Sequence, residues 1–427
     1  MKKLSPDCRV LVIGNGGREH AIIKSLRKSK YCGEVFCAEG NGGIASDATC
    51  ISFGNIAEMI AFCTNIDLVI IGPEQPLVDG VSDALREAGV LVFAPSQAAS
   101  QLESSKAFTK LICTEANIPT ANYAHFYDCA EALAYAATHK LPLVVKADGL
   151  AAGKGVVICI SHAQANEAIN DIFGGKFGAA GNSIVIEEFL TGEELSFFAI
   201  CNGETAVAFG SAQDHKTAYD GDKGPNTGGM GAYSPAPIVN DSLEHKIMAQ
   251  IVNPTIIAMK QRGTPYHGVL FAGLMIENDH PKLIEFNTRL GDPETQVILT
   301  RLQDDFLQIC FNAAQNILPD KFNFSNDAAL CVVMASKGYP ENYEKGSVIN
   351  GLSETSALPN VNIFHAGTAV NNNEIIAIGG RVLGVTATGV NVNGAASNAY
   401  EAVRTVNWPQ GFYRNDIGWR AIAKEKL

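Results

Sequence analysis

The sequence predicts an α/β protein built in three parts. We expect an N-terminal parallel α/β domain over residues 1–102, a two-lobed α+β middle domain over 103–325 and a β-rich C-terminal domain over 326–427. Short apolar runs alternate with helical patterns at the start of the chain, which is typical of a parallel sheet. The middle domain contains glycine-rich loops and strands that end in charged residues, and the C-terminal domain contains further apolar strands. A chain of 427 residues holds roughly two to four domains.

Composition and charge exclude several classes of protein. The apolar share of 47% and the charged share of 18% indicate globular cores. A net charge of −12 disfavours nucleic acid or an anionic membrane as the main partner. No run approaches the roughly 18 apolar residues that span a bilayer, and the apolar run at 10–13 is too short for a signal peptide. The 11 cysteines lack paired spacing, so we expect buried reduced thiols and a cytoplasmic protein.

In the first domain we expect strands at 9–14, 34–40, 67–72 and 90–94, with a helix from about Arg18. Glycines lie between the first strand and this helix, but Glu19 stands where a dinucleotide fingerprint needs a third glycine. Backbone N–H groups of Gly16 and Gly17 at the helix start, with Arg18, favour an anion site. The alternative is a tight turn without a ligand. Glu74 follows a strand at the same sheet edge, either as a ligand group or as a surface carboxylate.

The middle domain carries a second glycine cluster. A helix begins at Lys106, and Lys146 ends a strand before the loop 149–155. Three residues instead of four separate Gly149 from Gly153, and Gly155 replaces the Ser or Thr of a P-loop. The loop with Lys154 could still close over phosphates. A solvated strand end is the alternative interpretation.

The strand at 184–190 is rich in carboxylates, with Glu187, Glu188 and then Glu194. Such a strand end is suited to an adenine slot, where backbone near Glu188 and Leu190 meets the base and a carboxylate takes the ribose hydroxyls. Charged strand ends are also common on protein surfaces.

The segment 282–294 is the most informative. Strand alternation predicts Glu285, Asn287 and Arg289 on one face, with Ile284 and Phe286 on the other. A carboxylate and an amide oxygen side by side favour a hard cation bound to phosphates. We expect Mg²⁺, with Mn²⁺ as the alternative. The competing interpretation is an edge strand with a polar solvent face, against which the Gly-Asp-Pro-Glu turn after it argues.

Several blocks together resemble the ATP-grasp superfamily and, within it, the phosphoribosylamine–glycine ligase (glycinamide ribonucleotide synthetase) family. In chain order they are VIGNGGREHA, IIGPEQPLVDG, SSKAFTK, VVKADGLAAGKGV, EEFLTGEE, QDHK, GPNTGGMGAYSPAP, EFNTRLGDPETQ and FHAGT. RLGDPETQ and GPNTGGMGAYSPAP are specific to that ligase family, while the EFN and KAD–GKG elements are shared across the superfamily. One departure is Thr217, where the family usually has arginine. His215 beside it is more typical of a structural histidine.

The resemblance implies ligation of glycine to 5-phosphoribosylamine, giving glycinamide ribonucleotide, ADP and phosphate in the second step of de novo purine synthesis. A glycyl phosphate intermediate forms, and no protein nucleophile is required. Catalysis then depends on positioning and charge neutralisation. The first domain becomes a pre-ATP-grasp domain, and a lid is implied at about 121–190.

The resemblance also implies residue roles. Catalysis falls to Lys154, Arg289 and Asp214, and the metal to Glu285 and Asn287. ATP contacts fall to Lys106, Lys146, Lys154, Glu187, Glu188, Leu190 and Glu194. The sugar phosphate is expected at Gly16, Gly17 and Arg18, and glycine near Asp214, Arg289 and Asp292, with Glu74 as a further substrate contact. Biotin carboxylases supply another carboxylate twelve residues before their Glu-x-Asn, where this chain has Gly273; ATP oxygens and water would complete the metal shell.

Two alternatives remain beside this interpretation. The chain could be another ATP-grasp ligase, such as a biotin carboxylase-like protein, although the GDPETQ turn argues against it. It could also be a non-catalytic nucleotide sensor, although intact Lys146, Lys154, Glu285, Asn287 and Arg289 argue against that. Partners are expected to be small molecules, without nucleic acid or membrane, and the chain to be a monomer or weak dimer.

Overall fold

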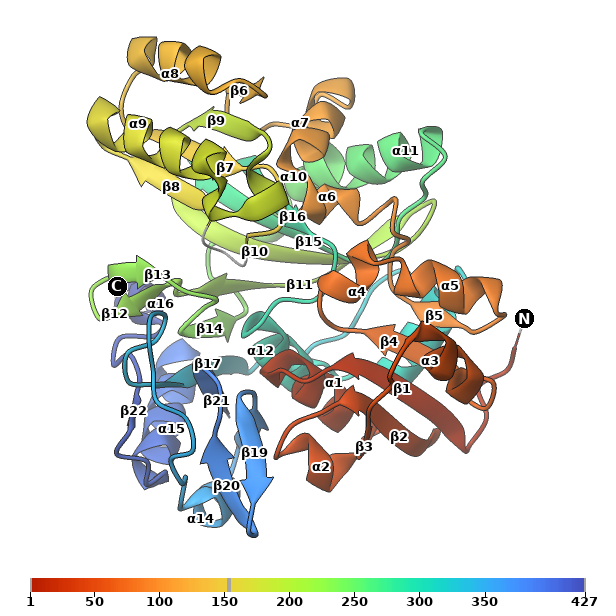
Figure 1. Ribbon diagram of the computed structural model, residues 1–427. Coiled ribbons are helices and arrows are strands. Elements are labelled where there is room, and N and C mark those ends of the chain that lie inside the picture. The colour runs from red at the N-terminus through yellow and green to blue at the C-terminus, as the bar shows by residue number, and fades with distance from the viewer. Residues whose placement is uncertain (1, 152–154, 426–427) are drawn as a thin grey trace.

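The computed structural model describes residues 2–151 and 155–425. Figure 1 shows three lobes around a common centre, with the N-terminal lobe in red, a yellow lobe above and the C-terminal lobe in blue. The mixed α/β fold class expected from the sequence is confirmed.

The N-terminal lobe has a parallel sheet in the order β3-β2-β1-β4-β5. Its strands are β1 (Cys8–Gly14), β2 (Cys32–Glu39), β3 (Thr49–Ile51), β4 (Leu68–Ile71) and β5 (Val92–Phe93). The intervening helices are α1 (Gly17–Leu26), α2 (Ile44–Asp47), α3 (Ile56–Cys63), α4 (Gln75–Val78) and α5 (Val81–Glu87). The sequence pattern missed β3, because this short strand is largely exposed and lacks an apolar run.

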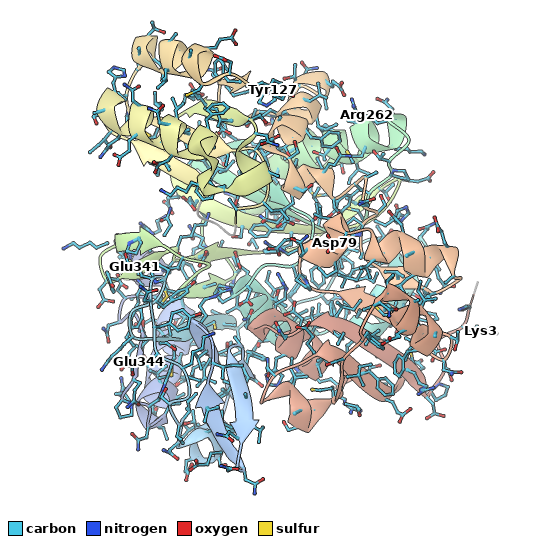
Figure 2. All side chains as sticks on the ribbon, viewed as in Figure 1. Lys3, Asp79, Tyr127, Arg262, Glu341 and Glu344 are labelled. Atoms are coloured by element: carbon cyan, nitrogen blue, oxygen red, sulfur yellow. The ribbon has the colours of Figure 1, made fainter. Side chains whose placement is uncertain are left out.

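The small lobe, residues 123–188, has its own antiparallel sheet in the order β6-β9-β7-β8. Its elements are β6 (Tyr123–Phe126), α8 (Cys129–Thr138), β7 (Leu143–Ala147), β8 (Val156–Cys159), α9 (His162–Asp171), the short π-helix η1 (Ile172–Lys176), the short 3-10 helix η2 (Gly178–Gly181), and β9 (Ile184–Glu188). Alanines of α8 and α9 pack on Val145 and Ile186 in a separate core. Figure 2 labels Tyr127 on this lobe, where the residue is 77% exposed.

Within the described residues, a nine-stranded sheet joins the rest of the middle domain to the C-terminal domain, in the order β16-β15-β10-β11-β14-β17-β21-β18 with β22 beside β17. These strands are β10 (Glu193–Asn202), β11 (Ala206–Asp214), β14 (Gly231–Ser234), β15 (His267–Glu277), β16 (His280–Asn287), β17 (Ala328–Ser336), β18 (Val361–His365), β21 (Arg381–Gly389) and β22 (Gly411–Phe412). The β14–β17 pair carries the sheet across the two domains. The boundary expected at 325/326 lies just before β17.

The remaining elements flank these sheets. They are α6 (Gln101–Ser104), α7 (Lys106–Glu115), β12 (Thr217–Tyr219), β13 (Lys223–Asn226), α10 (Asp241–Ile247), η3 (Met248–Val252), α11 (Asn253–Gln261), α12 (Glu294–Arg301), α13 (Phe306–Ala313), α14 (Leu352–Ser356), β19 (Thr368–Asn371), β20 (Glu374–Ala377), α15 (Val392–Thr405) and α16 (Trp419–Lys424).

Strand β16 departs from the predicted alternation. Glu285 pairs with Gly273, but Leu283 pairs with Leu274, so Ile284 is an extra residue in a bulge. Leu283 and Phe286 are therefore both buried in the core, whereas Ile284 is not. The expectation that Ile284 and Phe286 share the buried face is wrong for Ile284. The bulge frees the Ile284 carbonyl, which lies 3.4 Å from the Lys146 ammonium.

The cysteine expectation is largely confirmed. All eleven cysteines are free thiols and most are buried, with Cys50 exposed. In the residues that the structure describes, no helix has both the length and the apolar character needed to cross a membrane.

Candidate active site

Among the residues described, four cationic side chains lie near enough to Glu285 to influence its ionisation. The ionised Glu285 carboxylate is stabilised by the positive charges of Lys216, Lys146, Lys106 and Arg289. Burial by itself raises the pKa of Glu285, but these cations outweigh it and hold the pKa below its ordinary value. Glu285 therefore stays ionised. It lies two residues before Asn287 at the end of β16, directly opposite Gly273 on β15.

Each of these cations is held by another group. Lys146 contacts Glu187 at 2.9 Å, Lys216 contacts Glu194 at 2.8 Å and Arg289 contacts Glu103 at 2.8 Å. The Lys106 ammonium donates to the carbonyls of Asp148 and Gly149 at 3.3 and 3.1 Å, and burial lowers its pKa. The cations thus keep fixed positions without closing onto Glu285.

Glu187 is the centre of a buried cluster. Its carboxylate contacts Lys110 at 3.2 Å as well as Lys146, and Lys110 donates to Thr120 at 2.7 Å. All three charged side chains are 5% exposed or less. We therefore assign Glu187 the task of orienting Lys146. Lys110 was not expected from the sequence, although it lies four residues after Lys106 on α7, inside the SSKAFTK block.

The rest of the expected adenine slot lies at the end of β9. Glu188 accepts from the backbone N–H and side-chain amide of Asn122 at 3.1 and 3.0 Å. These bonds and Lys282 outweigh burial and lower its pKa. Leu190 is partly exposed just beyond the strand. Lys154, expected to bind phosphate, lies outside the described residues.

Arg289 lies beyond the end of β16 between two carboxylates. It contacts Glu103 at 2.8 Å and Glu74 at 3.4 Å. Glu103 also accepts from the Thr288 N–H and hydroxyl. Burial raises the pKa of Glu103, whereas Arg289 outweighs burial at Glu74 and lowers its pKa. Glu74 is thus an anchor for Arg289, and Glu103 is a second anchor that was not expected from the sequence.

At the start of α1, the groups of Arg18 that were expected to bind an anion are hydrogen-bonded within the protein. The Arg18 guanidinium donates to Glu19 at 2.6 Å and to the Leu290 carbonyl at 3.1 Å, and its backbone N–H donates to Asp292 at 3.3 Å. A Cβ on Gly16 would lie 3.3 Å from Asp292, so the glycine permits this approach. The Arg18 side chain is buried and its guanidinium already contacts Glu19 and the Leu290 carbonyl, so its expected contact with the sugar phosphate stays a prediction.

Beside Gly16 lies a cavity of about 290 Å³ between the N- and C-terminal lobes. Arg381 and Asp292 both line this cavity. The Arg381 guanidinium donates to the Asp292 carbonyl at 2.6 Å and lies 3.6 Å from the Asp292 carboxylate. Its walls include Asn15, Asn41, Gly367, Thr368 and Ile378. A guanidinium among amides and a hydroxyl suits a polar anionic ligand.

Asp214 ends β11 with a buried Oδ1 that has no hydrogen-bond partner in the described part of the chain. Burial, then the neighbouring Glu294, raises its pKa well above the ordinary range. Glu294 is itself buried and accepts from Ser196 at 3.0 Å. Two neighbouring carboxylates, one of them with an unpaired oxygen, favour the binding of a positively charged group of a ligand. Glu294 belongs to the GDPETQ block but was not singled out from the sequence.

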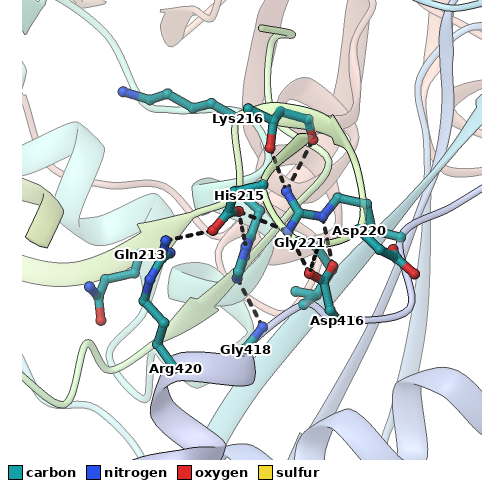
Figure 3. A network of polar contacts seen from close by, with 12 residues as sticks. Gln213, His215, Lys216, Asp220, Gly221, Asp416, Gly418 and Arg420 are labelled. Atoms are coloured by element: carbon teal, nitrogen blue, oxygen red, sulfur yellow. Dashed lines mark hydrogen bonds and ion pairs between the residues drawn. The ribbon is translucent and has the colours of Figure 1, made fainter. Parts of the chain in front are cut away.

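A network from the C-terminal segment holds the chain after Asp214 (Figure 3). Arg414, fully buried, contacts Asp416 at 2.8 Å and Asp222 at 2.9 Å, and donates to the Thr217 hydroxyl at 2.8 Å. The His215 ring accepts from the Gly418 N–H at 2.9 Å, which is the contact of a structural histidine. A guanidinium therefore does reach position 217, from the C-terminal segment.

Family models for phosphoribosylglycinamide synthetase match most of the chain. The N domain matches residues 8–103, the ATP-grasp (A) domain 104–295 and the C domain 329–420. A phosphoribosylamine–glycine ligase of Brucella melitensis is 51% identical over 423 residues, or 98% of this chain and 99% of that relative.

Two solved structures add to this comparison. Phosphoribosylamine–glycine ligase from Thermotoga maritima matches with a TM-score of 0.85 at 32% identity, covering 96% of this chain and 100% of that one. A biotin carboxylase from Campylobacter jejuni has a TM-score of 0.74 at 13% identity, covering 95% and 92% of the two chains. The latter is a likeness of fold alone.

The network in Figure 3 leads to a stability prediction. Arg414→Met leaves two carboxylates without their buried partner, and breaking a buried pair costs about 3–5 kcal/mol. Because Asp222 and Asp416 are partly solvated, we expect about 3 kcal/mol. The control Arg420→Met removes a 41%-exposed partner of Asp222 and should cost less than about 1 kcal/mol. Urea unfolding can be followed by tryptophan fluorescence, since Trp408 and Trp419 both lie in the C-terminal domain. Equal losses in both variants would refute the anchoring role.

Proposed function

The chain belongs to the phosphoribosylglycinamide synthetase family, and we propose how its residues carry out the reaction of that family. The chain is an ATP-dependent ligase that joins glycine to 5-phosphoribosylamine, giving glycinamide ribonucleotide, ADP and phosphate in de novo purine biosynthesis. A biotin carboxylase-like activity and a non-catalytic sensor role are thereby set aside. In this proposal the metal, ATP and glycine bind around Glu285, and phosphoribosylamine binds in the cavity beside Gly16.

The metal would lie at Glu285 and Asn287. Glu285 and Asn287 lie two residues apart on β16, so their side-chain oxygens are on the same side of the strand. The neighbouring cations keep Glu285 ionised. No group of three or more Asp, Glu, His or Cys side chains in the described ranges could hold a metal alone. ATP oxygens and water would therefore complete the shell, which suits Mg²⁺, with Mn²⁺ as the alternative. Such a cation would neutralise charge on the phosphates being transferred.

The ATP phosphates would lie along the fixed cations. Lys106 and Lys146 face Glu285 from α7 and β7, so phosphates bound to the same metal come within their reach. Lys154 is proposed as a third phosphate contact from the sequence alone. The base would lie near Glu188 and Leu190 at the end of β9, and the ribose near Glu194 at the start of β10.

Glycine would bind between Asp214 and Arg289. The unpaired Oδ1 of Asp214 is the observation that carries this assignment, because a buried lone acceptor of raised pKa favours an ammonium group. Glu294 adds to the attraction for that charge. The glycine carboxylate would face Arg289, whose orientation Glu74 and Glu103 fix.

Phosphoribosylamine would occupy the cavity beside Gly16. Arg381, Asn15 and Thr368 offer donors to its phosphate and hydroxyls, while the Asn41 amide holds the cavity wall by donating to the Asn15 and His365 carbonyls. Gly16 and Gly17 allow this approach, while Arg18 acts through its contacts to Glu19 and Leu290. Asp292 lies between this cavity and α12, within reach of both proposed substrate sites.

The reaction then proceeds in two transfers. The glycine carboxylate attacks the γ-phosphorus of ATP, ADP leaves, and glycyl phosphate forms. The ribosylamine nitrogen attacks the glycyl carbon, phosphate leaves, and the nitrogen loses a proton. Arg289 and the lysines stabilise the developing charge without reorganising, because their carboxylate partners already fix them. Asp214 orients the glycyl group throughout.

Further assignments complete the proposal. We place the domain boundaries at 102/103 and 325/326, with the small lobe as a lid. The free, mostly buried thiols support a reducing compartment, for which we propose the cytoplasm. The protein would act as a monomer or weak dimer. Multiple-turnover ADP release that requires both glycine and phosphoribosylamine is the assay for the whole proposal, and multiple-turnover release in the absence of one of these two substrates would contradict it.

The metal assignment predicts a loss of rate without a loss of fold. Glu285→Gln and Asn287→Leu should each lower kcat by about 10²–10³, the usual cost of losing a preorganised electrostatic group. Excess Mg²⁺ should restore part of the activity of each, because a weakened site refills by mass action. Rates and circular dichroism would be measured across a Mg²⁺ titration. Full activity of folded Glu285→Gln at limiting Mg²⁺ would disprove the assignment.

The glycine site predicts narrow specificity. Gly229 lies so close to Asp214 that a Cβ there would be 2.8 Å from Oδ1, so the site offers little room for a larger substrate. Alanine should be a poorer substrate by roughly 10–200-fold in kcat/KM, the range for one methyl group in a fitted pocket. Steady-state rates at saturating ATP test this, and equal turnover of both amino acids would contradict a small pocket.

The cavity assignment predicts a selective binding defect. Ile378 lines the cavity and is 42% exposed, so Ile378→Trp should narrow the cavity without disturbing the core. We expect weaker binding of glycinamide ribonucleotide, at least tenfold by calorimetry, with Mg·ATP affinity unchanged. Unchanged product binding would place the sugar phosphate elsewhere.

A further inference from the structure

A buried histidine connects the N-terminal lobe to the wall of the cavity beside Gly16. His20 lies on α1, and its Nε2 is 2.9 Å from the Asp47 carboxylate of α2. Its Nδ1 lies 2.8 Å from the backbone nitrogen of His365, which ends β18 in the C-terminal lobe. His20 is 1% exposed. None of the proposed substrate contacts involves this side chain.

The geometry fixes the state of the ring. A backbone N–H can only donate, so Nδ1 of His20 must be the acceptor. The proton of the neutral ring then lies on Nε2, which donates to Asp47. A second proton on Nδ1 would point at the His365 N–H and break the contact. His20 therefore has to be neutral, with one tautomer, for the two lobes to meet as they do.

The contact holds a segment that lines the cavity. Ala366, Gly367 and Thr368 come directly after His365 and form one wall. Two further bonds reach this segment from the N-terminal lobe: the Asn41 amide donates to the His365 carbonyl at 2.8 Å, and the Gly42 N–H donates to the Thr368 carbonyl at 3.0 Å. The His365 ring also lies 3.1 Å from the Thr368 hydroxyl. Figure 1 shows α1 and α2 facing the C-terminal strands across this junction.

The two ends of the His20 link are not equivalent. The Asp47 side chain is 31% exposed, so water can replace a lost donor there. The His365 end is buried, and an N–H left without an acceptor there would have to find one by moving the segment. A change at Nδ1 should therefore displace the cavity wall, whereas a change at Nε2 should be tolerated.

We propose that His20 is a positioning residue for the phosphoribosylamine substrate, because its Nδ1 holds the 365–368 wall at the distance that the sugar phosphate requires. The inference rests on the proposed placement of phosphoribosylamine in this cavity. His20 touches no substrate itself. It acts through the backbone of His365.

Two substitutions separate the two nitrogen atoms. His20→Asn keeps an oxygen near the position of Nδ1 and loses the Asp47 contact, whereas His20→Gln reaches toward Asp47 and leaves the His365 N–H without an acceptor. Binding of glycinamide ribonucleotide would be measured by calorimetry, and amide exchange of the 365–368 segment by mass spectrometry. KM for phosphoribosylamine and kcat would be measured in the same variants.

We expect His20→Gln to weaken product binding roughly tenfold, as for a buried N–H left unpaired. Its KM for phosphoribosylamine should rise similarly, with kcat and Mg·ATP affinity close to those of the unsubstituted protein. Exchange of the segment should be faster in this variant. His20→Asn should remain within about threefold in binding, with normal exchange. Equal weakening in both variants, or no weakening in either, would overturn the proposal.

The protein without substitutions gives an independent test. Nitrogen NMR of ¹⁵N-labelled histidine should show Nδ1 of His20 unprotonated and Nε2 protonated at neutral pH, and a protonated Nδ1 would overturn the proposal. Ile378→Trp separates this inference from the placement of the substrate. If that variant binds product normally, the placement in the cavity fails, and the role of His20 in positioning this substrate fails with it. If that variant binds product weakly while the two His20 variants bind it alike, the placement stands and the role of His20 fails.

Discussion

The site depends on one electrostatic constraint: cations must surround Glu285 without pairing with it. If Lys146 or Lys216 closed onto this carboxylate, the oxygens proposed for the metal would be occupied. The protein prevents this by giving each cation another partner, Glu187 for Lys146 and Glu194 for Lys216. The same device holds Arg289 through Glu74 and Glu103. Removing Glu187 would leave the buried Lys146 ammonium without its carboxylate partner, and an unpaired charge is costly in a low-dielectric interior.

This constraint explains why distant segments have to meet. The carboxylates that hold the cations come from the residue before α4 and from α6, β9 and β10. The cations come from α7, β7 and the segments that follow β11 and β16. The nine-stranded sheet fixes β11 and β16 relative to each other and extends into the C-terminal domain through the β14–β17 pair. The C-terminal Arg414 then holds the chain just beyond Asp214. The site is thus built from the whole chain.

The sequence predicted the helices and strands better than it predicted which side chains from different elements contact one another. Local patterns located β1, β4, α7 and β16, because apolar runs and capping residues act within a few positions. The bulge at Ile284 was missed, since an extra residue depends on the register against β15 and leaves no local signal. Glu103, Lys110 and Glu294 were missed for a similar reason, because each acquires its role from a partner on another element. The cavity beside Gly16 joins segments more than 300 residues apart, and no local pattern indicates it.

The chemistry gives a reason for the separate core of the small lobe. An acyl phosphate is readily hydrolysed, so water must be excluded while it waits for the amine. As the proposed lid, a lobe that brings Lys146 to the phosphates and also covers them would have to move as a unit, because β7 carries the lysine within the sheet itself. Its own core of α8, α9 and β9 side chains allows such motion without exposing the larger cores. The polar contacts that join the lobe to its neighbours include Glu187 to Lys110, Lys146 to the Ile284 carbonyl, and Lys106 to the carbonyls of Asp148 and Gly149. These contacts lie at the proposed phosphate end of the lobe, so in a lid movement the groups that hold the lobe would also orient the lysine, and closure and charge neutralisation would occur together.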